Sequence, residues 1–160
     1  MDPWHRDTVL RAYFVGKNWE ENPEFRLKRR LVLNPPQELS RFALIIEDEW
    51  EVTPGQAKEG RGDLVFADGL GEYAVVEVKY LNHERTGRAA RQARKERREH
   101  VQEQAKKYAR AYCNRLHDPS ATAVHAFSAT PEGIQWQVTF RRSDWWKEWE
   151  EDQDAAFEFP

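Results

Sequence analysis

Three charged residues have types and spacing that could support chemistry: Asp63, Glu77 and Lys79. Glu77 and Lys79 are two positions apart in an apolar run, so on a β-strand their side chains point to the same face. A hairpin would bring Asp63 beside them. Two carboxylates and a lysine in an apolar setting are costly unless they pair with one another or hold a cation. The sequence therefore predicts either a structural ion pair at a sheet edge or a metal site.

The elements that would position these residues are two strands joined by a glycine-rich turn. One strand covers residues 64–66 and the other residues 73–80, with Gly69 and Gly71 between them. Short apolar runs on either side of such a turn are typical of a β-hairpin.

Two segments precede this hairpin at the amino-terminal end. Apolar residues at helical spacing predict a helix from Asp7 to Trp19, with Asp7 or Thr8 as its cap. In residues 25–33, apolar and basic side chains alternate, which favours an edge strand with a basic outer face, although a helix also fits.

The next segment has the residues of a helix start. Asn34 can cap, Pro35 and Pro36 suit the first turn, and Gln37 can reach back to the cap. We expect this helix to end near Trp50 and to carry Glu38 in its first turn. Its predicted buried residues are Leu39, Phe42, Ala43 and Ile46.

After the hairpin, residues 88–116 contain almost nothing that breaks a helix. Apolar residues recur every three or four positions in the second half, which should pack on the sheet. The first half is basic and should project into solvent as a helix or be mobile. Residues 121–128 and 134–140 predict a second hairpin, and Ser143-Asp144 could cap a short helix with Trp145, Trp146 and Trp149 before an acidic end.

Composition predicts one folded domain. The chain has 160 residues, of which 39% are hydrophobic and 33% charged, and a net charge of -3. Cys113 is the only cysteine, which excludes an internal disulfide and fits a reducing, intracellular compartment, with cytoplasm and nucleus not distinguishable. No long apolar run predicts a membrane helix, so we expect a soluble protein with no membrane partner.

The order of these elements and charges resembles the PD-(D/E)XK nuclease superfamily, and in particular its RecB-like branch. The branch has three motifs: G-x-x-D, then D/E-x-K, then Q-x-x-x-Y on the next helix. Here they read Gly60-Arg61-Gly62-Asp63, Glu77-Val78-Lys79 and Gln104-Ala105-Lys106-Lys107-Tyr108. Gly62 stands where the superfamily usually has proline, as is common in this branch. The resemblance covers roughly residues 34–140, and three motifs in order are far more specific than any one alone.

The resemblance implies an α/β fold, a restriction-endonuclease-like mixed β-sheet flanked by α-helices with the active site at the edge of the first hairpin. It also implies that Asp63, Glu77 and the Val78 carbonyl bind Mg2+ or Mn2+, a hard cation that prefers oxygen ligands. Lys79 would orient or deprotonate the attacking water. Glu38 matches an additional metal-binding acid, although Glu47, Glu49 and Glu51 compete for that role. Gln104 and Tyr108 share a helix face and could position the water, the lysine or the scissile strand, or simply pack.

Basic side chains directly after the metal strand would lie beside the scissile phosphate, so we expect them to bind nucleic acid, although such runs are often only a solvated helix face. They are Arg88, Arg91, Arg94, Lys95 and Arg98.

The sequence thus predicts a metal-dependent nuclease whose preferred substrate is DNA. It does not distinguish an endonuclease from an exonuclease. A rival is a nucleic-acid-binding or assembly subunit that retains the nuclease fold without turnover. Another is a subunit whose partner supplies DNA targeting through the Trp-rich carboxyl-terminal end. A homo-oligomer is compatible with either.

Overall fold

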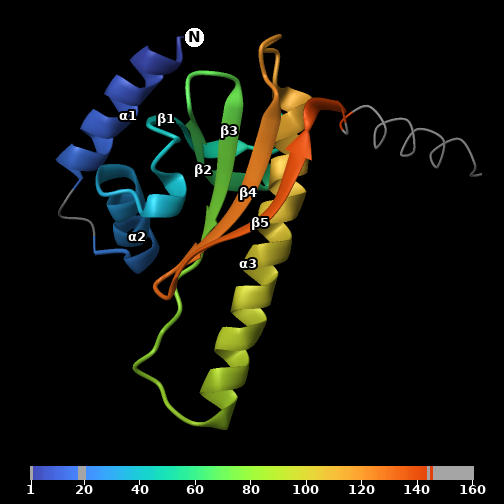
Figure 1. Ribbon diagram of the computed structural model, residues 1–160. Helices are drawn as coiled ribbons and strands as arrows, with labels where there is room; N and C mark the ends of the chain where they lie inside the picture. Colours follow the sequence, from blue (N-terminus) through green and yellow to red (C-terminus); the bar gives the residue numbers. More distant parts are fainter. Residues whose placement is uncertain (1, 18–20, 144, 146–160) are drawn as a thin grey trace, which may run out of the picture.

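The computed structural model describes residues 2–17, 21–143 and 145, and its regular elements form one sheet with helices on both faces (Figure 1). The helices are α1 (Pro3–Gly16), α2 (Pro23–Leu33) and α3 (Arg88–Arg115), and two short 3-10 turns are η1 (Gln37–Leu39) and η2 (Ala57–Glu59). The strands are β1 (Leu44–Glu51), β2 (Arg61–Ala67), β3 (Glu72–Val78), β4 (Ala123–Thr130) and β5 (Gly133–Arg141).

The five strands follow the order β1-β2-β3-β4-β5. Neighbouring strands are antiparallel except β3 and β4, which are parallel. A parallel pair needs a long crossover, and α3 supplies it between β3 and β4. The predicted α/β fold, a mixed sheet flanked by helices, is confirmed, as are both hairpins and the long helix. β3 is the central strand, so the first hairpin lies inside the sheet and not at its edge.

Each face of the sheet has its own apolar cluster. On one face, Leu27 and Leu31 of α2 pack with residues such as Leu64 and Val76. On the other face, Tyr108 and other residues from the second half of α3 complete a separate cluster. In Figure 1, α1 and α2 lie together on one side of the sheet, and the first half of α3 extends past it. This extension confirms that the basic half is a helix.

The predicted helix from Asn34 to Trp50 is wrong. Only η1 is helical there, and the chain then forms β1, which pairs antiparallel with β2. Leu39, Phe42 and Ile46 are buried as expected, but Ala43 is exposed. Helix-start residues were outweighed by pairing with the next strand, because tertiary contacts override weak local propensity. Glu38 therefore lies in a 3-10 turn.

The strand predicted for residues 25–33 is also wrong, and its helical alternative is confirmed. The signal that decides it lies just upstream, where the Asn22 carboxamide oxygen accepts hydrogen bonds from the Glu24 and Phe25 amides at 2.9 and 3.3 Å. Pro23 occupies the first helical position, where its missing N–H costs nothing. Buried residues Leu27 and Leu31 are then one turn apart.

The first helix is confirmed, but it begins earlier than predicted. Asp2 caps it, and Asp7 instead accepts a hydrogen bond from the Ile45 amide of edge strand β1 at 2.8 Å. Arg6 adds a bond to the Ile46 carbonyl at 2.5 Å. Helix α1 therefore covers the β1 edge, which would otherwise expose unpaired backbone groups. The predicted end, Trp19, lies outside the described residues.

At the other end of the chain, Trp145 packs against the α3 cluster and donates to the Phe140 carbonyl at 3.0 Å. Trp146, Trp149 and the acidic segment lie outside the described residues. Within the described ranges, the helices include none whose length and hydropathy would suit a membrane span.

Candidate active site

The carboxylates of Asp63 and Glu77 meet where β2 and β3 separate. The ladder between these strands ends with Leu64 opposite Val76. One position further, the Asp63 amide donates to Glu77 Oε1 at 3.0 Å, and the Val78 amide donates to Asp63 Oδ2 at 2.8 Å. At this position the backbone amides therefore donate to carboxylate oxygens, and not to the backbone carbonyls that would accept in a regular β-ladder. The predicted pairing of Asp63 with Glu77 is observed, at the open end of the hairpin.

Both carboxyl groups are in an environment that opposes their ionisation. Glu77 is only 2% exposed, and its pKa is raised well above the usual range, first by burial and then by the charge of Asp63. The pKa of Asp63 is also raised, mainly by burial, although the Val78 amide bond opposes this. The charge of Lys28 opposes the rise in the pKa of both groups, but burial outweighs it.

This donor set fits a hard divalent cation. Two buried carboxylates that repel one another are stabilised by a positive charge between them, and oxygen is the ligand that Mg2+ prefers. Among the described residues no group of three or more His, Cys, Asp or Glu side chains is arranged to hold a metal. Asp63 and Glu77 would therefore bind it with the Val78 carbonyl and water, which suits Mg2+ because it retains several waters.

Lys79 follows the last residue of β3, two positions after Glu77. Its amide donates to the Ala129 carbonyl of β4 at 2.9 Å, which fixes the backbone just after β3. Its side chain is 39% exposed, and its ammonium is 3.2 Å from the Glu24 carboxylate. The hollow that it lines, which we call the lysine hollow, has a volume of about 910 Å³ and is open to solvent. Its lining is Asn22, Pro23, Glu24, Lys79, Tyr80, Ala93, Glu96, Arg97 and His100.

The predicted upstream acid is not brought to the carboxylates by any described interaction. Glu38 is exposed, whereas Glu24, in the first turn of α2, pairs with Lys79 and raises the pKa of Asp63. Glu24 is therefore the upstream glutamate best placed for the role predicted for Glu38. The Asn22-Pro23 start of α2 was the signal that could have identified it.

The three competing glutamates of β1 are engaged elsewhere. Glu47 pairs with Arg6 at 2.9 Å, and Glu51 accepts from the Gly55 amide at 2.7 Å. Glu49 is exposed and has a left-handed backbone with φ of 49°.

A buried ion pair behind the carboxylates was not predicted. Lys28 of α2 is only 6% exposed, and its ammonium is 2.5 Å from the carboxylate of Asp48 on β1. The charge of Lys28 lowers the pKa of both Asp63 and Glu77. Lys28 follows Glu24 by one helical turn, so the correct helix would have placed both residues toward the site.

The first and third motifs meet on the α3 face of the sheet. Gln104 Nε2 donates to Tyr108 Oη at 3.1 Å, which confirms that the two share a helix face. Gly60 has a φ of 123°, and a Cβ there would come within 2.6 Å of Tyr108 Oη. Trp50 packs edge-on against the Tyr108 ring. No described bond joins Gln104 or Tyr108 to the carboxylates, so their catalytic role stays a prediction.

Two of the five predicted nucleic-acid-binding cations are bonded within the protein. Arg94 donates to the carbonyls of Asn82 at 3.2 Å and Arg85 at 2.8 Å, which ties the loop before α3 to the helix. Arg98 binds both oxygens of Glu132 at 2.8 and 3.1 Å. These bonds give both arginines a structural role.

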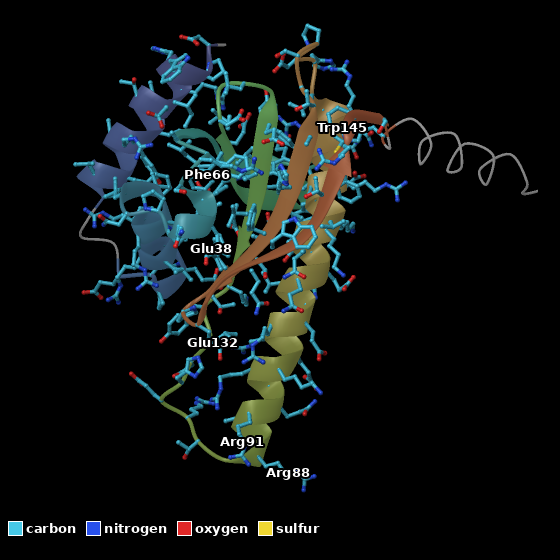
Figure 2. All side chains as sticks on the ribbon, viewed as in Figure 1. Glu38, Phe66, Arg88, Arg91, Glu132 and Trp145 are labelled. Carbon is cyan, nitrogen blue, oxygen red and sulfur yellow. The ribbon has the colours of Figure 1, made fainter. Side chains whose placement is uncertain are left out.

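The other three predicted cations are exposed. Lys95 lies 3.9 Å from Glu99 in a solvent-facing pair. Figure 2 shows Arg88 and Arg91 at the end of α3 that extends past the sheet. Among the described residues no partner is found for either guanidinium, so both could bind an anion.

No protein-family model matches the chain, and no curated protein or solved structure matches it either. What the chain does must therefore be inferred from its own residues: the buried carboxylate pair, the lysine two positions after Glu77, and the hollow that this lysine lines.

Proposed function

We propose that the chain is a divalent-cation-dependent nuclease of the PD-(D/E)XK type that hydrolyses phosphodiester bonds, with DNA the preferred substrate. The observation that carries this proposal is the buried pair Asp63 and Glu77: Glu77 accepts from the Asp63 amide, and Asp63 accepts from the amide of Val78, the residue between Glu77 and Lys79. Two carboxylates buried side by side repel one another unless one of them takes a proton or a cation lies between them. A cation held by these carboxylates, close in the chain to a lysine that lines a solvent-open hollow, suits chemistry on a phosphate.

The residues divide the work as follows. Asp63, Glu77 and the Val78 carbonyl would hold Mg2+ or Mn2+, which when bound neutralises charge developing on the phosphate and makes water more acidic. Lys79 would hold a phosphate oxygen or the attacking water in the lysine hollow, with Glu24 orienting its ammonium. Hydrolysis joins the water oxygen to phosphorus, breaks the bond to one sugar oxygen, and returns a proton to that oxygen.

The contact between Gly60 and Tyr108 adds support. Three motifs that lie far apart along the chain come together around one sheet: the glycine of the first meets the tyrosine of the third, and the aspartate of the first meets the glutamate of the second. A chance match of short patterns would not require these contacts.

The test is cleavage of circular and linear, single- and double-stranded DNA, and of RNA, with Mg2+, Mn2+ or EDTA. We expect metal-dependent cleavage that Asp63→Asn and Glu77→Gln each reduce by at least about a hundredfold, as loss of a major electrostatic contribution does. Lys79→Ala should reduce cleavage comparably. Glu38→Gln is the matched control, because Glu38 is exposed and outside the carboxylate pair; its activity should equal that of the parent chain.

Full activity in the Asp63→Asn variant would refute the proposed site. If the chain binds metal and nucleic acid but cleaves none of these substrates, the assembly-subunit alternative is the better description.

A further inference from the structure

A second hollow lies between α2, Tyr80 and Pro131, next to the lysine hollow. It has a volume of about 530 Å³. Its lining is Pro23, Arg26, Leu27, Arg29, Arg30, Leu33, Asn34, Tyr80 and Pro131. Three of these described lining residues are arginines and none is acidic. We call this surface the arginine groove, defined by Arg26, Arg29, Arg30 and Tyr80.

The arginine groove and the lysine hollow share two lining residues, Pro23 and Tyr80. Pro23 begins α2, and Tyr80 follows Lys79 directly in the chain. The half-buried Tyr80 ring therefore lies at the boundary between the lysine of the proposed active site and the α2 arginines. A ligand that crosses this ring contacts both surfaces.

The arginines of the groove retain donors for a ligand. Arg29 uses Nε to bond the Phe14 carbonyl at 2.9 Å, and Arg26 uses Nη2 to bond the Glu21 carbonyl at 3.0 Å. Each bond holds the side chain while leaving other N–H groups of the guanidinium available. Arg30 is exposed, and its guanidinium bonds no residue that the structure describes.

We propose that the arginine groove binds the phosphates of a single-stranded nucleic acid, with one base stacked on Tyr80, and leads that strand to Lys79. This proposal rests on the proposed nuclease function and adds its substrate class. Guanidinium groups match phosphate oxygens in shape and charge, and a single strand combines phosphates with bases that can stack on an aromatic ring. A duplex keeps its bases paired and stacked, so it could not use Tyr80 in this way.

The arginine groove would also take over part of the nucleic-acid binding that the sequence predicted for α3. There, Arg94 and Arg98 are bonded within the protein, and Lys95 faces Glu99. On α2 the arginine groove carries no opposing carboxylate among the described residues. The strand therefore enters along α2, a segment whose basic face the sequence shows but whose helical form only the fold establishes.

The experiment measures binding in EDTA, so that it does not depend on cleavage. Fluorescence anisotropy of a labelled oligothymidylate of about twenty nucleotides, and of a duplex of the same length, gives the affinity over a salt series from about 50 to 200 mM. We expect the single strand to bind more tightly. The double variant Arg26→Ala/Arg30→Ala should reduce the slope of log affinity against log salt by about 1.4, the value for two phosphates of a single strand.

The matched control is Lys106→Ala/Lys107→Ala, which removes two neighbouring cations from α3, where Lys106 pairs with exposed Glu103 and Lys107 is exposed. It should leave the slope unchanged. Tyr80→Ala should weaken binding at least about fivefold at every salt concentration, and Tyr80→Phe should restore it, because the ring carries the stacking.

Tighter binding of the duplex, or equal salt slopes in the arginine variant and its parent, would refute the proposal that the arginine groove binds a single strand. So would absence of oligonucleotide binding by the parent chain. None of these results depends on turnover. If cleavage is lost in Asp63→Asn while the arginine variant binds normally, the nuclease proposal is supported and only the proposed role of the arginine groove is refuted.

Discussion

Replacing Glu77 by Gln should stabilise the metal-free protein, the opposite of what most substitutions at a buried residue do. Glu77 is 2% exposed, and its Oε1 accepts from the Asp63 amide at 3.0 Å. The Gln oxygen can accept the same bond, and the side chain has nearly the same size. The substitution therefore removes the charge while keeping the packing.

The direction of the effect follows from the raised pKa of Glu77. In the folded protein Glu77 keeps its proton at pH values where the unfolded chain has already released it, because in the unfolded chain Glu77 has its ordinary pKa of 4.5. The stability that this proton supports is fully present below the unfolded pKa and is lost as pH rises through the folded pKa. Each pKa unit between the two states is worth about 1.36 kcal/mol. Gln does not titrate, so the Glu77→Gln variant does not lose this stability. At pH values above the folded pKa of Glu77, the variant is therefore more stable than the parent chain.

A divalent cation should reverse that ranking. At a concentration one hundred times its dissociation constant, a ligand of the folded state stabilises it by about 2.7 kcal/mol. For a domain of this size, 1 kcal/mol shifts Tm by roughly 2–4 °C, so Mg2+ or Mn2+ should raise the Tm of the parent chain by about 5–11 °C. Glu77→Gln lacks one carboxylate ligand and should show little of this rise.

Thermal and urea unfolding, followed by tryptophan fluorescence at about pH 4 and about pH 8 in EDTA and then in metal, measures all three effects. Glu38→Gln serves as control because Glu38 is exposed, and it should behave as the parent does. The reasoning fails if Glu77→Gln is less stable than the parent at the higher pH in EDTA, or if it gains the same Tm rise with metal.

Two further substitutions test the surroundings of the site. Lys28→Met leaves the carboxylate of Asp48 buried without its counter-ion and should cost about 3–5 kcal/mol of unfolding free energy, measured in urea at neutral pH; a loss below about 1 kcal/mol would show that Asp48 is solvated or protonated without cost. Gly60→Ala puts a Cβ against Tyr108 Oη at a φ of 123° and should cost about 1–3 kcal/mol. Gly60→Ala/Tyr108→Phe should recover the part due to the clash, and equal costs in both backgrounds would assign the whole effect to backbone conformation.

Local patterns in the sequence predicted much of the fold. Alternation and a glycine-rich turn predicted β2 and β3, the same signals predicted β4 and β5, and the spacing of apolar residues predicted α3. The errors fell on the segments before Gly60. There the cap at Asn22 was missed, and the helix-start residues at Asn34 pointed to a helix where β1 forms.

The candidate site divides in the same way. Residue spacing predicted that Glu77 and Lys79 lie on one side of a strand and that Gln104 and Tyr108 lie on one side of a helix. Such predictions are possible because strand and helix periodicity act over only a few residues. The identity of the upstream acid could not be found like this. Glu24 reaches Lys79 across 55 positions only because α2 packs on the sheet.

The sequence by itself therefore determined which residues of β2, β3 and α3 could act, since the periodicity of each element is encoded by its own residues. The tertiary structure decided which charges surround them. Lys28 meets Asp48, Arg98 meets Glu132, and the α2 arginines border Tyr80 because separate elements pack together. Electrostatic interactions depend on distance in space, and no local pattern encodes the distance between residues that only packing brings together.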